Sequence, residues 1–172
     1  MMQPIQQIHH ISAIVGDPQV NVDFYREVLG LRLVKQTVNF DDPYTYHLYY
    51  SNLSIENGTI ITFFPWANAH PGRWGVGTVH HIAWSVPNEE SQINWQDDLY
   101  TKGYGVTEIK DRNYFKAVYF KEPGTILFEI ATESPGFLID EPLETLGTAL
   151  KLPAQFEERR GEITAHLPKL TV

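Results

Sequence analysis

The feature of this sequence that most constrains its fold is an internal repeat. Residues 8–15 read IHHISAIV and residues 79–86 read VHHIAWSV, which places His10 and His81 at equivalent positions 71 residues apart. A second pair of similar segments, 59–64 and 125–130, follows at the shorter offset of 66. Matching segments in the same order, with unequal spacing, are typical of two copies of one unit whose loops differ in length. The chain is therefore expected to contain two modules of one fold.

Each copy has the pattern of a strand, a helix and three further strands. In the first copy Asp17 and Pro18 form a helix start, because Asp is a good N-cap and Pro suits the first helical position. An apolar stripe follows until Gly30, a residue typical of helix ends. The strands expected in the first copy are 5–15, 31–40, 45–51 and 58–65. Those expected in the second copy, around a helix over 88–102, are 78–86, 104–110, 114–121 and 125–131.

The domain organisation follows from the repeat and from the segments outside it. Residues 1–66 form the first βαβββ module, 67–77 a linker rich in Gly and Pro, and 78–133 the second module. Residues 134–172 form a tail, with short amphipathic helices expected near 141–150 and 153–166. The predicted fold class is α+β, with the two modules building a cupped mixed sheet around one metal site.

Composition excludes several classes of protein. The 172 residues are 42% hydrophobic and 13% aromatic, which is enough for a folded core. A net charge of −8 argues against a nucleic-acid partner, and no apolar run is long enough to span a membrane. The N-terminus lacks a signal-peptide pattern and the chain has no cysteine, so a cytoplasmic protein without thiolate chemistry is expected. Any metal must then be bound by His, Asp or Glu.

The alternation of strands identifies the residues that face the cup. Successive strand residues point to opposite faces of a sheet, and the apolar face should pack against the helices. This parity places His10, His81, Tyr119 and Glu129 together on the opposite face. Glu129 lies mid-strand between Phe128 and Ile130, where an ionised carboxylate needs a cation, a proton or several donors. An edge strand with one face in water is the alternative interpretation of Glu129 alone.

Two histidines at equivalent positions, together with that carboxylate, favour a metal site. His10, His81 and Glu129 form the set of two imidazoles and one carboxylate that is typical of non-haem Fe(II) sites. Fe(II) is thus the expected metal, with Mn(II) or Zn(II) as substitutes. Phe63, at the position that the offset of 66 equates with Glu129, cannot bind a metal, so three protein ligands are expected rather than four.

Five further residues are candidates for roles around the metal. His47 and Tyr49 share one strand face and are expected to line the substrate pocket, with a polar cross-strand pair as the alternative for His47. Phe63 is expected in the same pocket, because the repeat places it at the position of Glu129. Arg112 follows Asp111, and it either forms an ion pair in a turn or reaches an anionic substrate group. His9 is either a structural residue or a hydrogen-bonding neighbour of the metal ligands.

Several segments closely resemble the hydroquinone ring-cleaving dioxygenases of the vicinal oxygen chelate superfamily. The resemblance covers nearly the whole chain, with matching blocks in both halves. These blocks are residues 9–18, 22–25, 28–35, 37–43, 46–50, 62–66, 80–84, 111–112, 119–120, 122–124 and 127–132.

This resemblance implies a site and a reaction. It implies Fe(II) bound by His10, His81 and Glu129, with Tyr119 and His9 assisting substrate binding or proton transfer. The implied reaction is the O2-dependent opening of a para-diol ring, with a small aromatic substrate and O2 as the only partners. Members of that group are longer and hold four modules, and this chain resembles their first and last modules joined together.

The sequence also leaves two other functions open and predicts an assembly. A glyoxalase-type isomerase or lyase that uses Zn, Ni or Mn is the first alternative, and Phe63 at the fourth ligand position counts against it. A non-enzymatic protein that binds small aromatic molecules is the second, and the intact set of His10, His81 and Glu129 counts against that. A homodimer is expected, in which the tail over 134–172 covers exposed sheet surface or reaches the partner.

Overall fold

The computed structural model describes residues 2–171 and has two four-stranded mixed sheets. In the first module the sheet order is β1-β4-β3-β2, with β1 parallel to β4 and the other pairs antiparallel. The elements of this module are β1 (His10–Val15), α1 (Pro18–Asp23), the π-helical η1 (Phe24–Val28), β2 (Arg32–Asn39), β3 (Asp42–Ser51) and β4 (Ile60–Pro65).

The second module repeats this arrangement, with the order β5-β8-β7-β6 and β5 parallel to β8. Its elements are β5 (Ile82–Val86), α2 (Glu89–Thr101), β6 (Lys110–Asp111), β7 (Lys116–Lys121) and β8 (Leu127–Thr132). The predicted α+β class, with its paired βαβββ modules and helical tail, is confirmed. In the part of the chain that the structure describes, however, the strands form two separate sheets rather than one.

Local sequence explains where the helices begin and end. The Asp17 side chain accepts hydrogen bonds from the backbone N–H groups of Gln19 and Val20, which satisfies two donors at the start of α1. Asn88 caps α2 in the same way, through the N–H of Ser91. Gly30, with φ of +66°, lets the chain turn after η1 in a backbone conformation that costs glycine little.

The strand predicted over 104–110 is much shorter in the structure, and β6 has only two residues. Thr107 interrupts the regular ladder beside β7. Its backbone N–H donates to the carbonyl of Tyr119, while its side-chain hydroxyl accepts from the N–H of Tyr119. A side chain thus replaces a backbone carbonyl at this point, so the segment lies along β7 without continuing as a regular strand.

One helical segment packs between the two sheets. Tyr25 of η1 is fully buried against Phe63 and Tyr50 of the first sheet, with ring centroids 4.5 and 5.0 Å away. Its neighbour Phe24 packs against Phe120 and Phe128 of the second sheet, each with its centroid at 6.4 Å. Both sheets therefore turn one face, called the inner face, toward a shared apolar core. The opposite face of each sheet is called its outer face.

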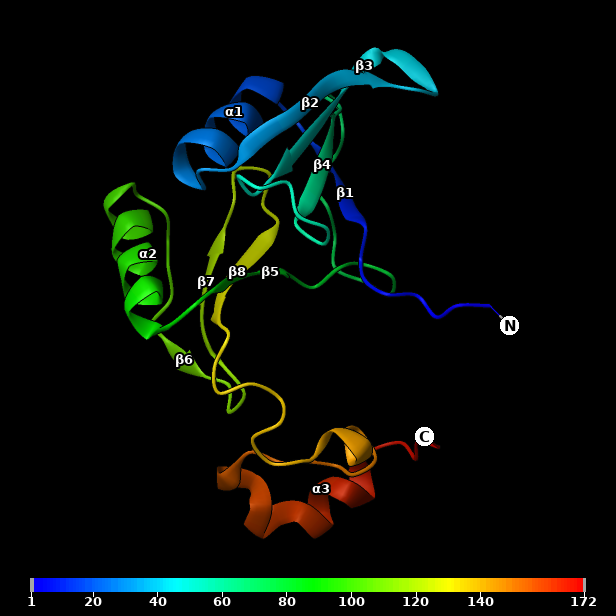
Figure 1. The fold of residues 1–172 in the computed structure, drawn as a ribbon, viewed down its shortest axis with the longest axis vertical. Coiled ribbons are helices and arrows are strands. Elements are labelled where there is room, and N and C mark those ends of the chain that lie inside the picture. The colour runs from blue at the N-terminus through cyan, green and yellow to red at the C-terminus, as the bar shows by residue number, and fades with distance from the viewer. Residues whose placement is uncertain (1, 172) are drawn as a thin grey trace.

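The tail lies apart from both modules (Figure 1). It contains two 3-10 helices, η2 (Leu143–Thr145) and η3 (Ala154–Arg159), and one α-helix, α3 (Arg160–His166). The helix predicted over 141–150 was wrong in length, since only one short turn forms after Pro142. Phe137 attaches the start of the tail to the second module by packing on Tyr114 and Phe115. Among residues 2–171, no helix is long and apolar enough to cross a membrane.

Candidate metal centre

The outer face of the second sheet brings an imidazole and a carboxylate together. Glu129 of β8 lies opposite Ala83 of β5 and Tyr119 of β7 in the register of the sheet. His81 immediately precedes β5, two residues before Ala83, so its side chain reaches the same face. Its Nε2 atom lies 2.8 Å from Oε2 of Glu129. The predicted proximity of these two residues is thus present in the structure.

Glu129 is buried, and its hydrogen-bond partners do not fully replace the water that its carboxylate loses on burial. The residue is 1% exposed, and Oε1 has no hydrogen-bond partner among the residues that the structure describes. An ionised carboxylate in such a place is costly unless a charge or several donors satisfy it. His81 satisfies only one oxygen. A buried carboxylate with one unsatisfied oxygen, next to an imidazole nitrogen, fits the donor set of a divalent metal ion.

Tyr119 and Arg112 lie next to this pair. The Tyr119 ring meets that of His81 edge to face, with centroids 6.0 Å apart. The Arg112 Nε–H donates to the Tyr119 hydroxyl at 3.3 Å, and its guanidinium lies 5.4 Å from the ring centroid. Burial raises the pKa of Tyr119, the hydrogen bond from Arg112 opposes that rise, and the charge of Glu129 adds to it. Tyr119 is therefore a protonated phenol at neutral pH.

Each of the two predicted histidine ligands is paired with the histidine before it. The Nδ1 atoms of His9 and His10 are 2.9 Å apart, and those of His80 and His81 are 2.8 Å apart. The rings in both pairs are close to perpendicular, with interplanar angles of 82° and 85°. Since Nδ1 is engaged in this way, Nε2 is the nitrogen left for a metal. A neighbour that fixes the tautomer and ring orientation is usual for histidine ligands.

The outer face of the first sheet carries a chain of hydrogen bonds instead of a carboxylate. Ser12 Oγ lies 2.7 Å from Thr62 Oγ1, which lies 2.9 Å from His47 Nε2. The Tyr49 hydroxyl completes the chain at 2.9 Å from His47 Nδ1. The predicted pocket residues His47 and Tyr49 thus share this face, and His47 is in addition stacked on Phe64. His47 therefore lies on the outer face and also forms cross-strand polar contacts, so the two interpretations offered for it are compatible.

The register corrects the position that the sequence equates with Glu129. Ser12 pairs with Thr62, which pairs with Tyr49, just as Ala83 pairs with Glu129 and Glu129 with Tyr119. Thr62 is therefore the equivalent of Glu129, at an offset of 67. Phe63 is fully buried on the inner face, so its predicted place in the substrate pocket was wrong. The expected asymmetry remains, because Thr62 has no carboxylate either.

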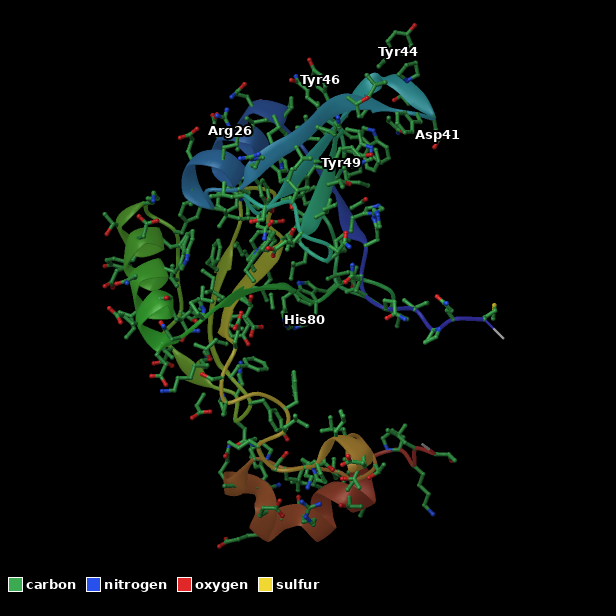
Figure 2. The ribbon with its side chains drawn as sticks, in the orientation of Figure 1. Arg26, Asp41, Tyr44, Tyr46, Tyr49 and His80 are labelled. Atoms are coloured by element: carbon green, nitrogen blue, oxygen red, sulfur yellow. The ribbon has the colours of Figure 1, made fainter. Side chains whose placement is uncertain are left out.

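The chain does not gather all three predicted ligands. Among residues 2–171, no group of three His, Asp or Glu side chains is close enough to hold a metal ion. His10 lies on the first module near His47, whose pKa is lowered by burial and by the neighbouring charge of His10. Figure 2 labels Tyr49 on β3 of the first module and His80 in the segment that leads into β5 of the second. His81 and Glu129 form one half of the predicted site, and His10 belongs to the other.

Thr62 is the outer-face residue that the sequence analysis missed. Ile60, Ile61, Phe63 and Phe64 flank it, so parity within the strand is ambiguous. The signal that could have located it is the hydroxyl itself. A threonine among Ile and Phe in a central strand needs a hydrogen-bond partner, and an open polar face supplies one.

Comparisons with known proteins agree with this fold. Residues 7–130 match the Glyoxalase/Bleomycin resistance protein/Dioxygenase superfamily. The chain therefore belongs to this superfamily. MhqO of Bacillus subtilis (strain 168), which is named as a ring-cleaving dioxygenase, is 33% identical, over 95% of this chain and 96% of that protein. The chlorohydroquinone/hydroquinone 1,2-dioxygenase of Sphingobium indicum is 33% identical over 69% of this chain and 37% of its own length.

A solved structure from Bacillus subtilis, described as a dioxygenase, is 34% identical with a TM-score of 0.57 and covers 96% of this chain and 97% of that one. These relatives make a dioxygenase the broad class to which the chain is similar. The alignment with MhqO extends over 299 positions, more than the 172 residues of this chain. Part of the longer relative thus has no counterpart in this chain.

Proposed function

We propose that this protein is an Fe(II)-dependent dioxygenase that opens the ring of a hydroquinone-like diol with O2. The observation that supports it most is the buried carboxylate of Glu129, with one oxygen unsatisfied and the other on His81. A residue of this kind is costly to retain unless it binds something. The names of the relatives MhqO and the chlorohydroquinone/hydroquinone 1,2-dioxygenase supply the reaction and the substrate class.

The residues that would hold the metal are His10, His81 and Glu129. When bound by two imidazoles and one carboxylate, Fe(II) supplies open coordination positions at which a diol oxygen and O2 can be brought together. His9 and His80 would each accept a hydrogen bond from the Nδ1–H of the following histidine. With a metal bound, that interaction would leave Nε2 of His10 and His81 free of a proton and available as the ligand atom.

Tyr119 would act on the substrate itself. Its hydroxyl accepts the hydrogen bond from Arg112, and its own proton, which lies beside the Glu129 carboxylate, would be donated to a bound substrate or product oxygen. The raised pKa keeps that proton in place at neutral pH. A positioned phenol that donates to a developing oxyanion contributes about a hundredfold to a thousandfold in rate. Arg112 is a positioning residue, because it acts through Tyr119.

O2 consumption tests this function. Fe(II)-loaded protein should consume O2 as hydroquinone disappears, in equal amounts, because both oxygen atoms enter the opened ring. Catechol, with its hydroxyls adjacent, serves as the matched control and should react much more slowly. Protein with a full complement of Fe(II) that shows no O2 uptake with any para-diol would exclude the dioxygenase assignment.

A further inference from the structure

A cavity of about 370 Å³ lies where the two modules meet. Its walls come from β1 of the first module, from residues 72–74 and 78–80, and from the hairpin between β7 and β8 of the second module. Isoleucine side chains on β1, β5 and this hairpin make much of the lining apolar. Volumes of ~300 to 1,000 Å³ and a largely apolar lining are typical of small-molecule sites. The cavity is therefore a candidate binding site.

Two cationic side chains line this cavity without a carboxylate. Arg73 lies in the segment between the modules and Lys121 at the end of β7, whereas no Asp or Glu is among the lining residues. Among residues 2–171, neither of these cations forms an ion pair. The chain as a whole has a net charge of −8, so the charge of this cavity is opposite to that of the molecule. Cations gathered in a concave site attract a ligand of negative charge.

Most of the other polar groups near the cavity already have partners. Ser12 Oγ lies 2.7 Å from Thr62 Oγ1, and the Thr78 hydroxyl donates to a backbone carbonyl. The carboxyl group of Glu122 adjoins Gly124, but it is buried, accepts a hydrogen bond from a backbone N–H and does not line the cavity. The two cations are thus the charged donors that remain for a ligand.

The cavity adjoins the proposed metal centre. Lys121 pairs with Leu127 across β7 and β8, and the pair Tyr119–Glu129 lies two residues away along both strands. Side chains two residues apart on a strand share one face and are separated by about 7 Å. Lys121 therefore lies on the same outer face as Glu129, one row further along the sheet.

An aromatic side chain forms part of the cavity wall on the side of the linker. Trp74 meets the ring of His80, with centroids 4.7 Å apart, and Nδ1 of His80 lies 2.8 Å from Nδ1 of the proposed ligand His81. The indole of Trp74 is 68% exposed, so much of its surface is free for contact with a ligand. Aromatic rings attract one another in offset-stacked and edge-to-face arrangements. This wall suits a ligand with a planar ring.

We propose that this cavity binds a carboxylate of the substrate, and that the substrate is a para-diol with an acidic group on its ring. Arg73 and Lys121 would bind the carboxylate, since a guanidinium can donate two parallel hydrogen bonds to it and an ammonium adds a point charge. Trp74 would contact the ring. This inference rests on the proposed function, because it assigns the substrate class of that same site.

The position of Lys121 favours an acidic group that is already present on the substrate. In the proposed reaction both atoms of O2 are retained, and the bond between a hydroxyl-bearing carbon and its neighbour breaks. The first carbon becomes a carboxylic acid and the second an aldehyde. That new acid forms at the proposed metal centre itself, whereas Lys121 lies one row further along the sheet. An acidic substituent on the ring is the group that reaches this row.

Binding of benzoate to metal-free protein tests the cavity without the reaction. Benzamide is the matched neutral ligand, because it has the same shape and no charge. Titration calorimetry with a chelator present should show benzoate binding about tenfold more tightly than benzamide. Lys121→Gln and Arg73→Gln should each lower this preference. Lys35→Gln is the control, since it removes the same charge from an exposed position on β2 outside the cavity. Equal affinity for the two ligands, or an equal loss in all three variants, would overturn the carboxylate site.

O2 uptake by Fe(II)-loaded protein tests the substrate class. In the wild type, kcat/KM should be higher for 2,5-dihydroxyphenylacetate than for hydroquinone. Lys121→Gln should lower the ratio of these two values by about tenfold, because the acid loses a charged partner. Lys35→Gln should leave the ratio as it is in the wild type. A ratio that the two variants change alike would overturn the assignment of an acidic substrate.

The two experiments separate this inference from the proposed function. O2 uptake with hydroquinone, together with no preference for benzoate over benzamide, would overturn this inference alone. Preferential binding of benzoate, together with no O2 uptake from any para-diol, would overturn the proposed function and leave the carboxylate site standing.

Discussion

The outer faces of the two modules have the same strand register but carry different polar side chains. In the first module Ser12, Thr62, His47 and Tyr49 form a continuous chain in which each polar side chain has a partner. In the second module the positions of Ser12 and Thr62 are taken by Ala83 and Glu129. The hydrogen-bond chain is thereby replaced by a buried carboxylate with an unsatisfied oxygen.

This difference shows how two copies of one module can contribute different ligands to one site. A satisfied face stabilises the sheet, and in the proposed site it would contribute one neutral ligand, His10. A face that is left unsatisfied costs stability in the absence of metal, and it supplies the negative charge that a metal ion needs. Substitutions at equivalent positions should therefore have opposite effects on metal binding and on stability.

The largest effect is expected from the pair Glu129→Ala and Thr62→Ala. Glu129→Ala should remove iron binding entirely while the protein stays folded, because it deletes the proposed charged ligand together with a buried carboxylate that is only partly satisfied. Thr62→Ala changes the equivalent position and should leave the iron content close to that of the wild type. Metal analysis after anaerobic loading, with circular dichroism for the fold, measures both. Iron retained in Glu129→Ala would remove that residue from the ligand set.

The next effect concerns the two equivalent tyrosines. Tyr119→Phe should lower turnover by about a hundredfold to a thousandfold with iron still bound, since the phenol is proposed to donate a proton without binding the metal. Tyr49→Phe removes the hydroxyl that contacts His47 and should change turnover far less. Steady-state O2 uptake of iron-loaded variants gives the comparison. Equal losses for the two variants would show that Tyr119 only fills space.

Removing the polar group at the two equivalent positions should change the free energy of unfolding in opposite directions, and this effect should be smaller. Thr62→Val keeps the shape of the side chain and removes the hydroxyl that contacts Ser12 and His47. It should lower the free energy of unfolding by about 1 to 3 kcal/mol, since those partners lose a hydrogen bond. Glu129→Gln, studied without metal, should not destabilise, because it removes an uncompensated charge. Urea unfolding of both variants measures the difference, and a large loss in Glu129→Gln would contradict the unsatisfied state of the carboxylate.

The smallest effect concerns a buried carboxylate outside the site. Burial raises the pKa of Glu122 in the folded protein, although the N–H groups of Gly124 and Ile126 partly offset this. Stability from this group is present below its unfolded pKa and is lost as pH rises through the folded value. Glu122→Gln should therefore gain stability relative to the wild type as pH rises from about 4 to about 7. Thermal unfolding at several pH values measures the trend, and a constant difference would contradict it.

Most of the fold could be predicted from the internal repeat and from the alternation of apolar and polar residues along the strands. The alternation in residues 10–15 and 82–86 identified inner and outer faces correctly, because each strand has apolar residues concentrated on one face. The faces of strand β4 could not be told apart from its sequence, because both are apolar except for Thr62. Phe63 was therefore assigned to the wrong face. How the modules pack was not predictable, because it depends on Phe24 and Tyr25 of η1, whose rings together contact aromatic residues of both sheets.

Metal analysis of the wild-type protein, purified without oxygen, tests most directly whether two imidazoles and the carboxylate of Glu129 form one Fe(II) site. Such a site predicts about one iron per chain, with little zinc or manganese. Stoichiometric zinc or nickel would point to an isomerase or lyase of this superfamily, and a metal-free protein would point to a binding protein. Either result would contradict the proposed Fe(II) centre.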